Sequence, residues 1–369
     1  MKYYIIAGEA SGDLHGANLI RELKKQDNQA EFRCWGGDLM KDQGAVLVKH
    51  YRELAFMGFL EVVMNLKTIF NNLKLCKSDI ENSKPDVLIL IDYPGFNMRI
   101  AEWAHLKGIK IVYYISPQIW AWKQSRVHKI KRDVDQMLVI LPFEKDFYAR
   151  FDMEVEFVGH PLLDALAQDQ QDGNNWKREH HLDEREIIAL LPGSRKQEIN
   201  TMLPLMLEAS SSFSEYQFVI AGAPSQPESY YRAITGDRKI SIISGQTYQL
   251  LKNSKAALVT SGTATLETAL IGIPEVVCYK GNFLSYQIAR QLVKVKFISL
   301  VNLVMDREVV KELIQEKLNK KELEAELKKL LTPEYRASML KDFAELRTLL
   351  GGIGASEKAA TLIFQMLNQ

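Results

Sequence analysis

Cysteines are few in this sequence, and their spacing argues against two kinds of small-protein scaffold. Cys34, Cys76 and Cys278 are the 3 cysteines among 369 residues, and they lie far apart. None belongs to a CxxC pair or a Cys/His cluster, which disfavours both a disulfide framework and a structural zinc site. We expect three buried thiols in a reducing compartment.

The sequence also lacks a charge imbalance and a long hydrophobic run. Its 47 basic and 46 acidic residues give a formal net charge of +1, so nothing indicates nucleic acid or a strongly acidic partner. The N-terminal residues 1–8 lack the apolar core of a signal peptide. No uninterrupted apolar run approaches the roughly 20 residues of a spanning helix. We expect a cytoplasmic protein that lies on a membrane if it meets one.

Short apolar runs alternate with helical segments along the chain, which predicts doubly wound parallel sheets. The clearest run, PDVLILID at residues 85–92, is almost continuously apolar, as expected of a strand covered on both faces. The polar stretch Gln168–Asn175 is predicted to be a linker or exposed loop between two such series. Further strands are expected at 3–7, 32–36, 109–115, 136–141, 155–158, 187–191, 217–221, 240–243, 256–259 and 275–279.

The length suits two domains of ordinary size. We predict one over residues 1–167 and another over residues 185–345, both of α/β class. From Asp306 onward the chain is predicted to be helical and charged, and it ends in an amphipathic helix at 355–367. Other helices are expected at 13–25, 198–211, 248–253, 265–271 and 284–293.

In doubly wound sheets, ligands bind beyond the carboxyl ends of the strands. The first such turn, Gly8–Asp13, is rich in small residues but is not GxGxxG, so a dinucleotide is not supported. Glu9, Ser11 and His15 are candidate site residues there, since a carboxylate at a strand end suits acid–base work or hydroxyl binding. Alternatively, Glu9 complements a helix dipole.

Asp92 is the candidate general base, because it ends the most apolar strand and precedes a Pro-Gly turn. Partial burial would raise its pKa toward that of a base. The alternative is a carboxylate that caps the turn. One strand further along, Trp120 and Trp122 suit stacking on a sugar, packing an acyl chain or simple core packing.

The second half offers two candidate anion sites. In the first, Gly193 and Ser194 open a helix N-terminus, which favours anions, and Arg195 adds a bidentate cation for a diphosphate. Glu198 belongs to the same predicted substrate-binding motif.

The second anion site combines hydroxyl and backbone donors at a helix start. Its residues are Ser261, Gly262, Thr263 and Thr265, which suit a phosphate without a metal. Glu267 follows Thr263 by one helical turn and could accept both hydroxyls of a ribose. Alternatively, Thr263 and Glu267 form a capping arrangement.

Residues 54–70 carry too many large apolar side chains for a helix with one face in solvent. They predict either a helix buried in the core or an exposed face that accepts acyl chains or rests on a bilayer. Arg126, His128, Lys129, Lys131 and Arg132 would add attraction to anionic lipid. The predicted patch comprises Phe56, Met57, Phe59, Leu60, Val63, Leu66 and Phe70.

Six motifs occur in order along nearly the whole chain: GEASGD, PDVLILIDYPGFN, SPQIWAW, FVGHPLLD, LPGSRKQEI and SGTATLE. Together they resemble the lipid-A-disaccharide synthase family of bacterial glycosyltransferases. The resemblance implies a GT-B fold, in which two Rossmann-like doubly wound α/β domains face a central cleft and the helix at 355–367 returns to the first domain. It also implies an enzyme bound peripherally to the inner membrane, with no metal or cofactor.

The implied reaction moves 2,3-diacylglucosamine with inversion from UDP onto 2,3-diacylglucosamine 1-phosphate (lipid X). The products are lipid A disaccharide 1-phosphate and UDP. By resemblance, Asp92 is the base, Glu9 and His15 position the acceptor or assist that base, and Arg195 neutralises the diphosphate. Phosphates and ribose are assigned to Ser261, Gly262, Thr263 and Glu267. Asn302 matches a family position near the nucleotide, where Val301 replaces the usual proline.

Two other functions fit the same residues. A UDP-sugar 2-epimerase would isomerise a soluble UDP-sugar with no acceptor present. A non-catalytic nucleotide-sugar binding protein would bind UDP tightly without turnover. The sequence leaves acyl-chain length and oligomeric state open, with a homodimer among the options.

Overall fold

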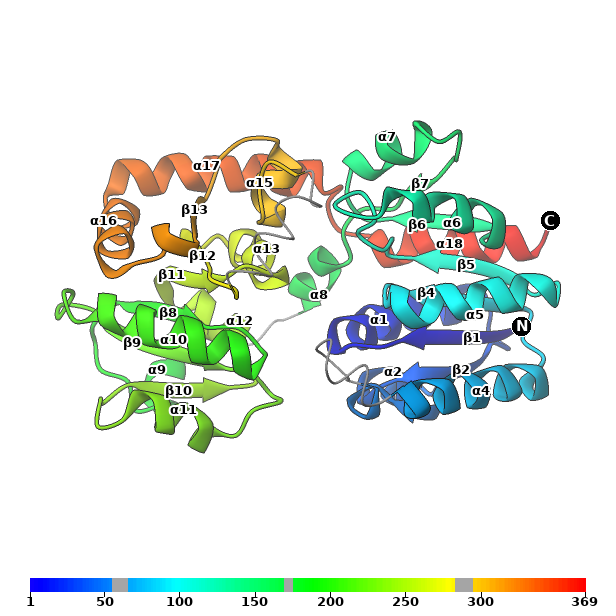
Figure 1. The fold of residues 1–369 in the computed structure, drawn as a ribbon, viewed down its shortest axis with the longest axis horizontal. Helices are drawn as coiled ribbons and strands as arrows, with labels where there is room; N and C mark the ends of the chain where they lie inside the picture. Colours follow the sequence, from blue (N-terminus) through cyan, green and yellow to red (C-terminus); the bar gives the residue numbers. More distant parts are fainter. Residues whose placement is uncertain (55–65, 169–174, 283–294) are drawn as a thin grey trace. The chain divides into compact units, whose positions relative to one another are not determined.

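The computed structural model describes residues 1–54, 66–168, 175–282 and 295–369. The chain forms two compact units, Met1–Gln168 with Leu350–Gln369, and Asp169–Leu349. Each unit is a parallel sheet with helices between its strands (Figure 1). The α/β class and the two doubly wound domains are therefore confirmed.

In the described part of the first unit, seven parallel strands lie in the order β3-β2-β1-β4-β5-β6-β7. The order reverses between β1 and β4, and Ala7 pairs with Ile91, so these two strands end level with each other. Such a reversal is where doubly wound sheets bind ligands. The strands are β1 (Lys2–Ala7), β2 (Glu31–Gly36), β3 (Val46–His50), β4 (Val87–Ile91), β5 (Lys110–Tyr114), β6 (Gln136–Val139) and β7 (Glu156–Phe157).

The C-terminal helix belongs to the first unit and packs against its first helix. The Asp164 carboxylate accepts hydrogen bonds from the amides of Gly354 (2.7 Å) and Ser356 (2.8 Å), which caps the start of this helix. The helices of the unit are α1 (Ala10–Gln26), α2 (Asp38–Asp42), α4 (Leu66–Ser83), α5 (Pro94–Leu106), α6 (Val127–Asp133), α7 (Phe143–Ala149), α8 (Leu162–Gln168) and α18 (Ala355–Leu367).

The described residues of the second unit form a six-stranded parallel sheet in the order β10-β9-β8-β11-β12-β13. Here the order reverses between β8 and β11, where Leu191 pairs with Val259. The strands are β8 (Ile187–Leu191), β9 (Gln217–Gly222), β10 (Ser241–Ser244), β11 (Ser254–Thr260), β12 (Glu275–Tyr279) and β13 (Lys311–Ile314).

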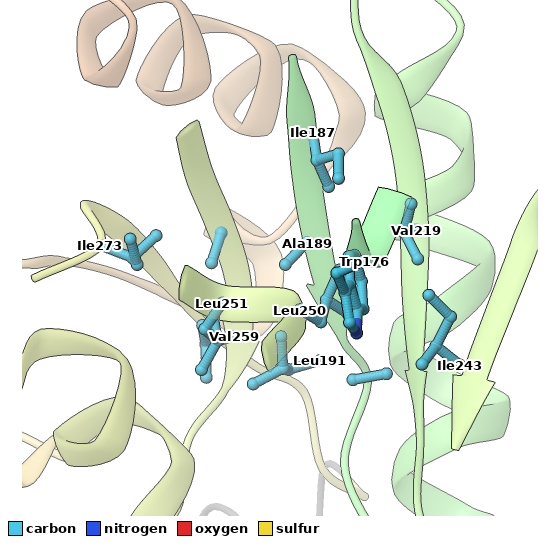
Figure 2. Packing of buried hydrophobic residues seen from close by; sticks show 12 residues of the cluster. Trp176, Ile187, Ala189, Leu191, Val219, Ile243, Leu250, Leu251, Val259 and Ile273 are labelled. Carbon is cyan, nitrogen blue, oxygen red and sulfur yellow. The ribbon is translucent and has the colours of Figure 1, made fainter. Parts of the chain in front are cut away.

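One face of this sheet packs on Trp176 and on a helix that carries Leu250 and Leu251 (Figure 2). Alternate residues of β8, Ile187 and Leu191 among them, point into this cluster, as the two-residue period of a strand requires. The helices of the unit are α9 (Trp176–Glu179), α10 (Lys196–Ser210), α11 (Glu228–Thr235), α12 (Thr247–Lys252), α13 (Thr263–Ile271), α15 (Leu300–Met305), α16 (Lys320–Leu330) and α17 (Pro333–Leu349).

The predicted strands are present, and those at 187–191 and 275–279 have the predicted bounds. The prediction of an all-helical chain after Asp306 is wrong, because β13 lies at Lys311–Ile314. β3 was also missed. Both are edge strands with charged residues, so neither carries a strong apolar pattern. The helix predicted at 284–293 and most of the predicted linker lie outside the described residues.

Candidate active site

The strand reversal of the first unit brings together the turns after β1 and β4. Gly8 and Tyr93 pack closely there, since a Cβ added to Gly8 would stand 2.3 Å from Cγ of the Tyr93 ring. Only glycine allows this approach. The two predicted carboxylates, Glu9 and Asp92, follow the two strands on this edge of the sheet.

Asp92 has the electrostatic character of a general base. Its side chain is half-buried, and burial, followed by the negative charge of Glu9, raises the pKa of its carboxyl to about 7. Glu9 itself is exposed. Near neutral pH, Asp92 can therefore both exist as a carboxylate and hold a proton that it has accepted.

His15 lies deeper, on α1, with 8% of its surface exposed. Burial lowers the pKa of its imidazole to about 4, so the ring is neutral at physiological pH. Its Nδ1 is buried without a hydrogen-bond partner among the described residues. Ser11, by contrast, is exposed in the first turn of α1. A role for His15 in acceptor positioning and a role for Ser11 in substrate binding stay predictions.

Asp13, the last residue of the GEASGD motif, has a structural role that the sequence did not reveal. Its carboxylate accepts hydrogen bonds from the amides of Gly37 (2.7 Å), Leu39 (3.1 Å) and Met40 (3.1 Å). It therefore caps α2 from a distant part of the chain.

The two tryptophans of the loop after β5 have different surroundings. Trp120 is buried and meets Phe143 edge to face, with ring centroids 5.0 Å apart. Trp122 is 42% exposed, and Lys123 Nζ lies 4.6 Å from its ring centroid. Of the predicted alternatives, core packing describes Trp120, while Trp122 remains available to a ligand.

Glu144, beside this loop, was not predicted. It is fully buried and accepts hydrogen bonds from the amides of Ile140 (3.2 Å) and Leu141 (2.9 Å). Burial raises the pKa of its carboxyl to about 7. An acidic residue in the first turn of α7, directly after β6, was the available signal.

In the second unit, the turns after β8 and β11 lie on one edge of the sheet. Gly193 has φ +104°, and a Cβ there would stand 2.5 Å from Glu198 Oε2. That oxygen accepts hydrogen bonds from the amides of Ser194 (3.1 Å) and Arg195 (3.3 Å). Glu198 therefore caps α10 itself, and its Oε1 also pairs with Arg195 Nη1 at 3.6 Å, while the Arg195 side chain stays 58% exposed.

The turn after β11 leads into α13 through Gly262, which is exposed. Thr265 is buried, and its hydroxyl donates to the Gly262 carbonyl (2.9 Å), while the Ser261 hydroxyl donates to the Ile298 carbonyl (3.2 Å). Thr263 is exposed at the helix start, where backbone amides favour an anion.

Glu267 lies one turn further along α13. It is half-buried, burial raises the pKa of its carboxyl, and Oε1 accepts a hydrogen bond from the Tyr248 hydroxyl at 3.2 Å. The alternative that Thr263 caps the helix is wrong. The residue at the N-cap position is Gly262, which has no side chain that could form a capping hydrogen bond.

Asn302 is fully buried, and its side chain is occupied by the protein. Its amide group donates to the Val310 carbonyl (2.8 Å) and to Glu312 Oε1 (2.9 Å), and Oδ1 accepts from the amides of Val309 (2.7 Å) and Val310 (3.0 Å). Asn302 thus ties α15 to β13, and Val301 beside it is buried in α15. That Asn302 lies near the bound nucleotide stays a prediction.

Most of the predicted apolar patch, from Phe56 to Val63, lies outside the described residues, and nothing is described of the Leu66 side chain. Phe70, on α4, is 62% exposed. It borders a groove of about 740 Å³ between α4 and α5, whose walls carry Trp103, the cations Lys74, Lys77 and Arg99, and the carboxylates Glu81 and Glu102.

Several of the basic residues predicted to face lipid have protein partners. Arg132 pairs with Asp133 at 2.6 Å and with Glu102 at 2.8 Å. Lys131 donates to the Phe151 carbonyl at 3.0 Å. The Arg132 charge is therefore offset by two carboxylates, whereas the groove carries three cations and two carboxylates on its walls.

Two further features are missing from the ranges that the structure describes. None of the helices there is long and apolar enough to cross a membrane. The same ranges hold no group of three or more His, Cys, Asp or Glu side chains placed to bind a metal ion.

Comparison with solved structures identifies relatives of the fold. UDP-GlcNAc 2-epimerase from Neisseria meningitidis, bound to UDP-GlcNAc, matches with a TM-score of 0.70 at 15% identity, over 100% of both chains. The glycotransferase of kitacinnamycin matches with a TM-score of 0.66 at 15% identity, over 99% of both. At these identities the likeness concerns the fold alone.

Comparison of sequences identifies the family. The model for lipid-A-disaccharide synthetase matches residues 3–365. The lipid-A-disaccharide synthases of Syntrophus aciditrophicus and Trichlorobacter lovleyi are each 39% identical over 99% of this chain and 97% of theirs. That of Nitrosococcus oceani is 39% identical over 98% and 95%. The chain therefore belongs to the lipid-A-disaccharide synthase family, the glycosyltransferases of lipid A biosynthesis.

Proposed function

We propose that the protein transfers 2,3-diacylglucosamine from UDP onto lipid X, with Asp92 as the general base. The observation that carries the proposal is the carboxyl group of Asp92, with its pKa of about 7, at the strand reversal of the first unit. The acceptor is assigned to this unit and the UDP part of the donor to the second.

The proposed step is a single displacement at the anomeric carbon of the donor. Asp92 takes the proton of the acceptor hydroxyl while the oxygen of that hydroxyl bonds to the anomeric carbon. The bond from the same carbon to the diphosphate oxygen breaks on the opposite face, and UDP leaves with the electron pair. One attack of this kind inverts the anomeric configuration.

The leaving diphosphate gains negative charge during this step, and the second unit offers positive potential to offset it. The Arg195 guanidinium is exposed beside the start of α10, and the start of α13 is open at Thr263. We assign to Glu267 the role of accepting hydrogen bonds from the ribose hydroxyls. These groups suit a reaction without a metal ion.

We also place the protein on a membrane surface, since both proposed substrates carry acyl chains. The support is the exposed Phe70 at a groove whose walls carry Lys74, Lys77 and Arg99. Glu81 and Glu102, which also line the groove, pair with Lys107 and Arg132, and an apolar side chain beside the three cations suits the boundary between anionic headgroups and acyl chains.

Mass spectrometry of purified protein with UDP-diacylglucosamine and lipid X tests the proposal. Disaccharide 1-phosphate and UDP should form only when both substrates are present. Isomerisation at C2 of a UDP-sugar without acceptor would support the epimerase instead. The fold likeness to UDP-GlcNAc 2-epimerases is the observation that keeps this second candidate in the experiment.

A further inference from the structure

The backbone around Asp92 adopts a conformation that side chains normally disfavour. Asp92 has φ +42° and Tyr93 has φ +49°, so two consecutive residues other than glycine lie in the left-handed region. On the neighbouring strand end, Ile115 has φ +66°, which is unusual for a β-branched residue. Such strain persists only where surrounding contacts enforce it.

Those contacts come from two fully buried side chains. The Tyr113 hydroxyl donates to the Asp92 carbonyl at 2.7 Å, and Asn97 Nδ2 donates to the same oxygen at 2.8 Å. Asn97 also lies 3.2 Å from the Ile91 carbonyl and 3.4 Å from the Ile6 carbonyl, so it joins the ends of β4 and β1.

The backbone amide of Asp92 is held as well as its carbonyl. The Asp92 amide points toward the carbonyls of Tyr114 and Ile115, both at 3.3 Å. With its amide and its carbonyl both fixed, the direction of the Asp92 Cα–Cβ bond is fixed too.

We propose that Tyr113 and Asn97 are positioning residues for glycosyl transfer, which hold the strained Asp92 backbone so that its carboxylate meets the acceptor hydroxyl. The inference rests on the proposed role of Asp92 as the base. Neither side chain touches the substrate. Each acts through the direction that it gives to Asp92.

Tyr113→Phe is the sharper test, because the Asp92 carbonyl keeps Asn97 as a donor and the ring keeps its volume. A displaced base costs rate rather than binding. We expect kcat to fall about 10- to 100-fold, with KM for the UDP donor unchanged. The acid limb of the kcat/KM profile should also move below its wild-type position near pH 7, because a released carboxyl regains water.

Tyr4→Phe is the matched control. Tyr4 is fully buried in the same sheet, and its hydroxyl donates to Asp79 at 2.7 Å, away from the strand ends. It should lose stability but keep both kcat and the pH profile. Asn97→Ala, checked for folding by circular dichroism, should repeat the kinetic signature of Tyr113→Phe.

A double mutant separates this inference from the proposed function. If Tyr113 acts through Asp92, Asp92→Asn/Tyr113→Phe will be no slower than Asp92→Asn alone. Multiplied losses, or wild-type kcat and pH profile in Tyr113→Phe, would overturn the positioning role while leaving the base intact. Wild-type turnover by Asp92→Asn alone would instead overturn the base.

Discussion

The carboxyl group of Asp92, the proposed base, has a raised pKa that costs the folded chain stability. Its pKa is about 7 in the folded chain against 3.8 as the ordinary value, so its ionised form is disfavoured in the folded state. The folded chain therefore loses stability as pH rises from about 4 to about 7, and the loss is complete above pH 7.

Asp92→Asn should consequently stabilise the protein while it slows transfer at least about 100-fold. We expect a higher Tm than wild type at pH 8, and a difference that shrinks toward zero near pH 4, where both side chains are neutral. Calorimetry at the two pH values measures this. A lower Tm for the variant at pH 8 would show that the Asp92 carboxylate is stabilising.

Glu9 raises the pKa of Asp92 through its negative charge, and this gives a kinetic prediction. The rate should rise with pH through about 7, as Asp92 loses its proton. Glu9→Gln removes the repulsion, so the acid limb should move down by about half a pH unit. Glu31→Gln, exposed at the start of β2, is the control. If the acid limb of the pH–rate profile does not move in Glu9→Gln, the charge of Glu9 does not act on Asp92.

Arg195 is expected to hold the diphosphate by charge and geometry together. Arg195→Ala should weaken UDP binding at least about 10-fold, and Arg195→Lys should fall between because it loses the bidentate contact. Isothermal titration calorimetry with UDP measures both, with the exposed Arg238→Ala as control. If Arg195→Ala binds UDP with the same affinity as the wild-type protein, Arg195 does not contact the donor.

Single residues could be predicted where they follow a strong strand. Asp92 was singled out because β4 is uniformly apolar, and Arg195 because it follows β8, and their roles stay predictions. The contacts of Asp13 with Gly37 and of Glu144 with Ile140 depend on the fold, so composition and spacing did not reveal them.

At the scale of elements, buried parallel strands were predictable and edge strands were not. β4 and β8 are covered on both faces and read as continuous apolar runs. β3 and β13 each have one neighbour, and they carry lysine or glutamate beside their apolar residues. Their hydrogen bonds to the sheet, rather than a strong apolar pattern, define them.

The groove between α4 and α5 gives a prediction for membrane binding. Phe70→Glu places a negative charge among Lys74, Lys77 and Arg99, where an anionic surface would approach. Co-sedimentation with vesicles rich in anionic phospholipid should fall about fivefold or more. Ile353→Glu, at a site 72% exposed in the loop before α18, is the matched control. Equal sedimentation of the two variants would count against this face.

At the scale of the whole molecule, fold and family carry different information. Epimerases and glycosyltransferases share this architecture at 15% identity, so the fold does not distinguish their reactions. The relatives at 39% identity over nearly full length establish the family. Within that family, the proposed roles of Asp92 and Arg195 name the groups that we expect to move the proton and to hold the leaving group.

Turnover of UDP-diacylglucosamine with lipid X, followed by mass spectrometry in excess chelator, tests the central claim most directly. Wild-type protein should form disaccharide 1-phosphate and UDP in equal amounts, and folded Asp92→Asn should form both at least about 100-fold more slowly. Product from Asp92→Asn at the wild-type rate would contradict the assignment of the base. C2 isomerisation of a UDP-sugar by the wild-type protein, with no disaccharide formed, would contradict the proposed reaction itself.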